Sequence, residues 1–177
     1  MPTAMFDTVL INGSVGTGKT TAAEGVGVAL EQLGIPGAVI DVDWLRRSWP
    51  APQDDPFRTA LGLENLQSVA SNFRRAGAHV LVVATVVETV EELQRSKAAL
   101  GSRTLLHVRL TADADAVLSR LTRRHTDDEA ALRWHARRHP ELARVLDRAG
   151  FAGELVIDTT DQPATAIAQQ IVTALVG

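Results

Sequence analysis

Cysteine is absent from this sequence, and so are a basic leader segment and any long apolar run. Without cysteine the chain has no disulfide, no thiolate zinc site and no cysteine nucleophile. The segment over 1–5 carries no basic residue, and the apolar run over 6–11 is too short for a signal peptide or a membrane span. We therefore expect a cytoplasmic protein that has no membrane partner.

Lysine is scarce as well, because Lys19 and Lys97 are the only lysines among 18 basic residues. The formal net charge of −3 does not suit a nucleic-acid binder, so we expect no nucleic-acid partner. The surplus of arginine suits bidentate contacts to phosphate, although genome composition alone can produce it. The 177 residues, 45% of them hydrophobic, fit a single domain over 1–177, either a monomer or a homodimer.

One motif is complete: Gly13-Ser14-Val15-Gly16-Thr17-Gly18-Lys19-Thr20 follows G-x-x-x-x-G-K-[ST], the phosphate-binding P-loop. A strand-like run over 6–11 precedes it and a helix-like run over 21–33 follows it. The glycines allow a tight turn that brings backbone N–H groups to an anion, and the helix points its positive end there. We expect the loop, Lys19 and Thr21 to bind the phosphates of ATP, and the Thr20 hydroxyl to bind Mg²⁺. A glycine-rich turn that binds nothing is the alternative.

Strand-like and helix-like segments alternate along the rest of the chain, with further strands expected at 38–42, 79–85, 104–110 and 154–158. A long helix is expected over 129–149, with a break near Pro140 as one alternative. This alternation predicts a three-layer α/β fold around a five-stranded parallel sheet. Ligands of such sheets bind at the carboxyl ends of the strands, where several candidates fall: the P-loop, Asp41, Asp43, Thr85 and the turn over 159–161.

Two aspartates and an arginine follow the second expected strand. The carboxylate of Asp43 can accept a proton from an acceptor hydroxyl or hold Mg²⁺ through water, and Asp41 is a second candidate for the same site. Arg46, one helical turn later, can grip an anionic substrate. Either aspartate can instead cap the short helix that follows. Further candidates for the acceptor pocket, or for plain packing, come next in the chain: Trp44, Trp49, Phe57 and Arg58.

An arginine-rich stretch follows the fourth expected strand: Arg120, Arg123, Arg124, Arg133, Arg137, Arg138, Arg144 and Arg148. Phosphoryl transfer needs cations around the moving group, and mobile lids often supply them. We expect a lid around 120–140, with Arg120 and Arg124 facing the ligand as catalytic groups and Arg120 also contacting the nucleotide. The alternative is a solvated helix face with pairs such as Glu129 and Arg133. His135 and His139 lack a third metal ligand and are expected at the surface.

The P-loop and the segment Asp41-Val42-Asp43-Trp44-Leu45-Arg46 together resemble the small P-loop kinases of the adenylylsulfate kinase, gluconate kinase and chloramphenicol phosphotransferase group. Adenylylsulfate kinases carry Asp-Gly-Asp-x-x-Arg at the second place, and here valine replaces the glycine. The resemblance implies a fold like that of nucleoside monophosphate kinases, with Asp43 as the base and Arg46 as an acceptor ligand. It also implies that the turn Asp158-Thr159-Thr160 lies beside adenine, so that Thr160 contacts the nucleotide.

These features predict an ATP-dependent phosphotransferase that acts on a hydroxyl of a small molecule. The third expected strand ends Val82-Val83-Ala84-Thr85, without a Walker B aspartate, which argues against a motor ATPase more than against a kinase. A nucleotide or nucleoside kinase and a nucleotide-binding switch without catalysis are the alternatives. The sequence does not name the acceptor, because the segment over 48–73 does not match the adenylylsulfate-binding pattern.

Overall fold

The computed structural model describes residues 4–177, so residues 1–3 of the start segment lie outside it. A parallel sheet of five strands has the order β2-β3-β1-β4-β5 and confirms the predicted fold class. The elements in chain order are β1 (Thr8–Gly13), α1 (Lys19–Gln32), β2 (Gly37–Asp41), α2 (Val42–Leu45), α3 (Thr59–Arg75), β3 (Val80–Ala84), α4 (Val90–Ala99), β4 (Leu105–Thr111), α5 (Ala114–Arg124), α6 (Glu129–Arg148), β5 (Leu155–Asp158) and α7 (Ala164–Val176).

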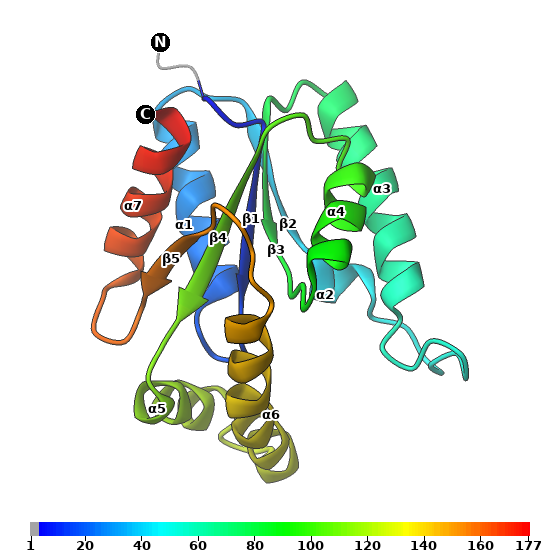
Figure 1. Ribbon diagram of the computed structural model, residues 1–177, viewed down its shortest axis with the longest axis vertical. Coiled ribbons are helices and arrows are strands. Elements are labelled where there is room, and N and C mark those ends of the chain that lie inside the picture. The colour runs from blue at the N-terminus through cyan, green and yellow to red at the C-terminus, as the bar shows by residue number, and fades with distance from the viewer. Residues whose placement is uncertain (1–3) are drawn as a thin grey trace.

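Helices cover both faces of the sheet: α1 and α7 lie on one side, and α3 and α4 lie on the other (Figure 1). Side chains of a strand alternate between its faces, and the central strands here are apolar on both. In β1, Val9 and Ile11 pack in the cluster with α1 and α7, whereas Leu10 packs in a cluster with α6. The three layers follow from this alternation.

Helices α5 and α6 lie at the carboxyl ends of the strands, below the sheet in Figure 1. The second half of α6 is anchored there, because Leu142 and Leu146 are buried against Leu10 of β1 and Leu93 of α4. The helix runs unbroken through Pro140, so the break considered for that position does not occur. Proline costs a helix one hydrogen bond and some strain, which the packing of Leu142 and Leu146 after it offsets.

Side chains cap the starts of α4 and α6. The Thr89 hydroxyl accepts a hydrogen bond from Glu92 N at the start of α4, and Asp128 accepts one from Ala131 N at the start of α6. Within residues 4–177 no helix is long and apolar enough to cross a membrane.

Candidate active site at the phosphate-binding loop

The P-loop joins β1 to α1 in the conformation that its glycines require. Gly18 occupies the N-cap of α1 with φ 94°, a left-handed conformation that other residues seldom adopt. A side chain on Gly13 would meet the Leu110 carbonyl oxygen at 2.6 Å, so the neighbouring strand also demands glycine. Within the loop the Thr17 hydroxyl donates to the Ser14 carbonyl at 2.9 Å and holds the turn closed.

The Lys19 ammonium lies in the centre of this loop. Its Nζ donates to the carbonyl oxygens of Gly13 at 2.9 Å and of Ser14 at 3.0 Å. Burial lowers the pKa of Lys19 to about 8, although the carboxylates of Asp43 and Asp41 oppose the shift. A partly desolvated cation that is surrounded by the loop backbone is placed to meet a phosphate group.

Asp41 contacts the P-loop directly and also caps a helix. One of its carboxylate oxygens accepts from the Thr20 hydroxyl at 2.7 Å, and the other accepts from Asp43 N at 2.9 Å, at the start of α2. The capping alternative therefore applies to Asp41. The carboxylate of Asp43 is 74% exposed and lies 3.7 Å from Arg46 Nε, so it stays open to a ligand from solution.

Thr20 and Asp41 together suit a magnesium ion. Mg²⁺ takes hard oxygen ligands, keeps several waters and is usually bound through one or two protein oxygens together with substrate phosphates. The Thr20 hydroxyl gives its proton to Asp41 and keeps its own lone pairs available. Within residues 4–177 no group of three or more His, Cys, Asp or Glu side chains could hold a metal alone. The residues therefore fit Mg²⁺ that is shared with a nucleotide.

Arg120 links the P-loop to the turn after β5. Its guanidinium donates to the Thr159 hydroxyl at 3.0 Å and to the Thr160 carbonyl at 3.2 Å, and it reaches the Gly16 carbonyl at 3.4 Å. The Thr159 hydroxyl in turn lies 3.1 Å from the Thr17 carbonyl. Arg120 thus holds together the two loops that the resemblance assigns to the nucleotide.

The other three residues predicted to contact the nucleotide or its phosphates, Thr160, Arg124 and Thr21, lie in different surroundings. Thr160 uses its hydroxyl to accept from Asp113 N at 2.9 Å, which ties the turn to α5. Arg124 is exposed at the end of α5, and its charge adds to the lowering of the pKa of Lys19 that burial causes. Thr21 is exposed in the first turn of α1.

Two further residues predicted for the acceptor pocket, Trp44 and Arg58, have their polar contacts outside the P-loop. Trp44 is 67% exposed, and the Arg47 guanidinium lies 4.6 Å from the centre of its ring. Arg58 adopts φ 54° at the N-cap of α3, and its Nε donates to the Ser48 hydroxyl at 3.1 Å. These two side chains organise the segment between α2 and α3, and within residues 4–177 neither forms a hydrogen bond or ion pair with a P-loop residue.

His139 is buried, at 6% exposure, so the expectation of a surface position is wrong. Its Nδ1 lies 2.8 Å from the Ser14 hydroxyl and 3.1 Å from the Val15 carbonyl, so α6 is joined directly to the P-loop. Burial lowers the pKa of His139, the hydrogen bond to Val15 opposes that shift, and the Lys19 charge adds to it. The sequence carries a signal for this position, because His139 shares one helical face with Leu142 and Leu146.

Asn12 is a second residue that the sequence analysis missed. Its buried amide donates to the Val87 carbonyl at 2.9 Å and accepts from Gly13 N at 2.8 Å and from Val87 N at 3.2 Å. It therefore fixes the entry to the P-loop against the segment after β3. That segment continues to Glu88, whose carboxylate lies 2.6 Å from Arg138 of α6.

Three solved structures illustrate what the fold is similar to. A tunicamycin resistance protein of Deinococcus radiodurans is 22% identical with a TM-score of 0.65, and the match covers 94% of each chain. Shikimate kinase of Acinetobacter baumannii, in complex with shikimate, is 18% identical with a TM-score of 0.65, over 96% of this chain and 93% of that one. A gluconokinase of Sinorhizobium meliloti 1021 is 17% identical with a TM-score of 0.60, over 94% and 89%.

These identities are low, so the three structures establish the fold alone. No curated protein sequence matches the chain. The family model described as AAA domain matches residues 9–138, which run from β1 through the P-loop into α6. This match covers more than half of the chain, and it includes Lys19, Asp41 and Arg120. The chain therefore belongs to the AAA domain family of P-loop proteins.

Proposed function

We propose that the protein is an ATP-dependent phosphotransferase that phosphorylates a hydroxyl group of a small molecule. The observation that carries the proposal is the joint arrangement of Lys19, Thr20 and Asp41 at one loop, with the open carboxylate of Asp43 next in the chain. Phosphoryl transfer depends mostly on positioning and on charge neutralisation. The printed names of the similar structures include two small-molecule kinases, shikimate kinase and gluconokinase, which agrees with this proposal.

In this proposal each group has one task. The loop over 13–20 and Lys19 bind the phosphates, and Thr20 with Asp41 holds Mg²⁺, which neutralises charge on the phosphate oxygens when bound. Asp43 takes the proton from the acceptor hydroxyl while the oxygen of that hydroxyl forms a bond to the γ-phosphorus of ATP. The bond from that phosphorus to the bridging oxygen of ATP breaks, and ADP leaves with the electron pair. Arg46, which pairs with Asp43, contacts the acceptor.

The segment over 120–140 serves as the lid in the same proposal. Arg124, exposed at the end of α5, is placed to approach the transferring phosphoryl group when the lid closes. Arg120 has a different part, because its contacts to Gly16, Thr159 and Thr160 shape the nucleotide side of the site.

The test is a screen of small hydroxyl compounds with ATP and Mg²⁺, read by mass spectrometry for the mass of one added phosphate. Wild-type protein should give a product that Lys19→Ala does not form. ATP binding without any phosphorylated product across a broad screen would contradict the proposal and favour a nucleotide-binding switch. A nucleoside or nucleoside monophosphate as the acceptor would instead indicate a nucleotide kinase.

A further inference from the structure

A buried polar network lies beside the entry to the P-loop, on the face of the sheet against which the second half of α6 packs. Its central residue is His107 of β4, which is 4% exposed and lies opposite Leu10 of β1 in the parallel register. The Phe151 ring packs edge-on against the imidazole, with 4.7 Å between the ring centroids. An apolar neighbour satisfies neither ring nitrogen, so the polar groups that face the two nitrogens decide how the imidazole acts.

The first ring nitrogen of His107, Nε2, faces the side-chain amide of Asn12, with 3.4 Å between Nε2 and Nδ2. Other contacts fix the orientation of this amide. Its Oδ1 accepts from the backbone N–H groups of Gly13 at 2.8 Å and Val87 at 3.2 Å, and its Nδ2 donates to the Val87 carbonyl at 2.9 Å. The amide therefore presents an N–H to the imidazole, and Nε2 must accept it. A neutral imidazole that accepts at Nε2 carries its proton on Nδ1.

The second ring nitrogen, Nδ1, faces a carboxylate. Glu154 Oε2 lies 3.9 Å from His107 Nδ1, and both atoms are buried without a hydrogen bond to any residue of 4–177. This oxygen attracts a proton on Nδ1 and would repel a lone pair there. The carboxylate thus favours the same tautomer that the Asn12 amide requires. Burial lowers the pKa of His107 to about 4, and the Arg109 charge adds to that shift, so the imidazole is neutral at pH 7.

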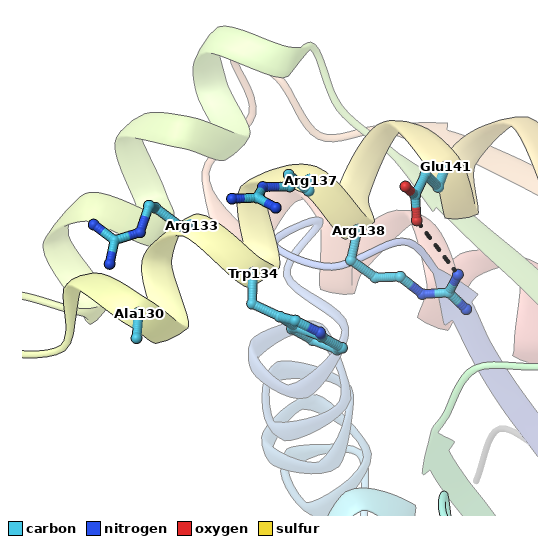
Figure 2. Close-up of a pocket in the computed structure, with 6 residues that line it drawn as sticks. All are labelled: Ala130, Arg133, Trp134, Arg137, Arg138 and Glu141. Carbon is cyan, nitrogen blue, oxygen red and sulfur yellow. Dashed lines mark ion pairs between the residues drawn. The ribbon is translucent and has the colours of Figure 1, made fainter.

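Arg109 holds the Glu154 carboxylate in this place. Its Nε donates to Glu154 Oε1 at 3.0 Å, and its Nη1 lies 2.6 Å from Asp147 Oδ1 in α6. The first half of α6 exposes basic side chains, among them Arg133 and Arg137 (Figure 2), whereas Asp147 in its second half offers Arg109 an acid. A chain of contacts therefore runs from α6 through the guanidinium and the carboxylate to the buried imidazole.

We propose that His107 is a positioning residue for the phosphate-binding loop. Its unprotonated Nε2 holds the Asn12 amide in the orientation in which Oδ1 accepts from Gly13 N. Gly13 in turn places its carbonyl oxygen 2.9 Å from Lys19 Nζ. A proton on Nε2 would oppose the amide N–H, and the loop would lose its fixed entry before nucleotide binds. The inference rests on the proposed function in one respect, because it takes this loop as the ATP site.

The first test reads the tautomer of His107 in the wild-type protein. NMR spectra of the histidine ring nitrogens are recorded at pH 7, and the spectrum of His107→Gln identifies the His107 signals. Nδ1 should have the chemical shift of a protonated nitrogen, and Nε2 should have that of an unprotonated one. A proton on Nε2 in place of Nδ1, or protons on both nitrogens, would overturn the proposal.

The second test compares ATP affinities in the presence of Mg²⁺ by calorimetric titration. His107→Leu removes the acceptor and should raise the Kd for ATP about threefold to tenfold, whereas His107→Gln offers Asn12 an amide oxygen and should keep the wild-type Kd. Phe151→Leu is the matched control, because it removes the ring that packs on His107 and leaves the partners of both ring nitrogens in place. It should lower the Tm and leave the Kd unchanged.

Three results of this comparison would overturn the proposal. They are a wild-type Kd in His107→Leu, a Kd in His107→Gln as high as that in His107→Leu, and the same rise of the Kd in Phe151→Leu. The last result would mean that the loop responds to the packing around His107 and not to its ring nitrogen.

A double variant shows whether His107 acts through Asn12. Asn12→Ala should raise the Kd for ATP by more than His107→Leu does. Adding His107→Leu to Asn12→Ala should raise it no further, because the imidazole then has no amide to hold. Single effects that multiply in the double variant would show that the two residues act independently, which would also overturn the proposal.

ATP binding does not depend on turnover, so failure of this inference is distinguishable from failure of the proposed function. The expected Kd values without any phosphorylated product would count against the kinase alone. Product formation by the wild type, together with a wild-type Kd in His107→Leu, would count against His107 alone. A wild-type protein that binds no ATP would overturn both.

Discussion

The contact between α6 and the P-loop gives a sharp prediction through His139→Phe. Phenylalanine keeps a buried ring of similar size, but it cannot bond to the Ser14 hydroxyl or the Val15 carbonyl. A buried polar group that loses its partner costs about 1–3 kcal/mol. The two oxygens share one ring nitrogen, so we count one lost bond and expect the free energy of unfolding to fall by that amount. For a domain of this size each kcal/mol lowers the Tm by about 2–4 °C.

The same variant should weaken nucleotide binding. Ser14 and Val15 belong to the loop whose N–H groups meet the phosphates, and without His139 the free loop is less ordered before binding. Part of the binding energy then goes into ordering it, and about 1.4 kcal/mol corresponds to a tenfold higher Kd for ATP. Calorimetric titration with ATP and Mg²⁺ measures this effect, and thermal unfolding measures the first.

His79→Phe is the matched control for His139→Phe. His79 is exposed before β3, its side chain forms no hydrogen bond within residues 4–177, and its replacement should change stability by less than about 0.5 kcal/mol. Wild-type Tm and wild-type ATP affinity in His139→Phe would refute the argument. A lower Tm with unchanged ATP affinity would show that His139 supports packing and does not shape the loop.

Further predictions concern the charged groups of the site. The pKa of Lys19 is lowered to about 8, so on raising the pH the folded protein loses this proton before the unfolded chain does. The contribution of Lys19 to the free energy of unfolding should therefore rise between pH 8 and about 10.5. Denaturation of wild type and Lys19→Met at several pH values checks this. ATP should return the proton, so calorimetry at pH 8.5 in buffers of different ionisation enthalpy should show proton uptake that Lys19→Met lacks. Asp43→Asn should lower acceptor phosphorylation by about 10²–10⁴ and leave ATP affinity unchanged, whereas Asp41→Asn should weaken Mg²⁺-dependent ATP binding; equal behaviour of the two variants would contradict the separate roles. Arg120→Gln should lower both Tm and ATP affinity, since it frees the turn after β5, and a change in turnover alone would contradict that placement.

The sequence predicts the parts of this structure that depend on local patterns. The P-loop follows a motif of fixed spacing. The central strands are apolar on both faces, as in Val80–Ala84, which indicates buried strands. Because strands alternate with helices along the chain, the parallel arrangement of the five strands also follows. The N-cap role of Asp41 is also among the alternatives that the sequence predicts, because aspartate is a common N-cap residue. What local patterns cannot supply is which of Asp41 and Asp43 faces Thr20, since that depends on the position of β2 relative to α1.

The residues of the site that the sequence does not predict were missed for one reason. Asn12, Glu88 and His139 act through partners far away in the chain: Asn12 and Val87 are 75 positions apart, and Ser14 and His139 are 125 apart. No spacing rule connects such pairs, and only the folded sheet and the docked α6 bring them together. For His139 the helical spacing with Leu142 and Leu146 predicts burial, but the local sequence does not indicate that the side chain contacts the P-loop.

Pro140 gives the anchored helix α6 a mechanical property. Its first half carries exposed arginines, and its second half is packed on the core. His139, which contacts the P-loop, directly precedes Pro140, the one residue of α6 that cannot donate a backbone hydrogen bond. The helix therefore resembles a lever whose fulcrum rests on the phosphate loop. By linkage, a ligand that displaced the first half of α6 would change nucleotide affinity at the P-loop, and the nucleotide would change the affinity of that ligand by the same factor. Under the proposed function, the P-loop and the lid over 120–140 are in this way linked through α6.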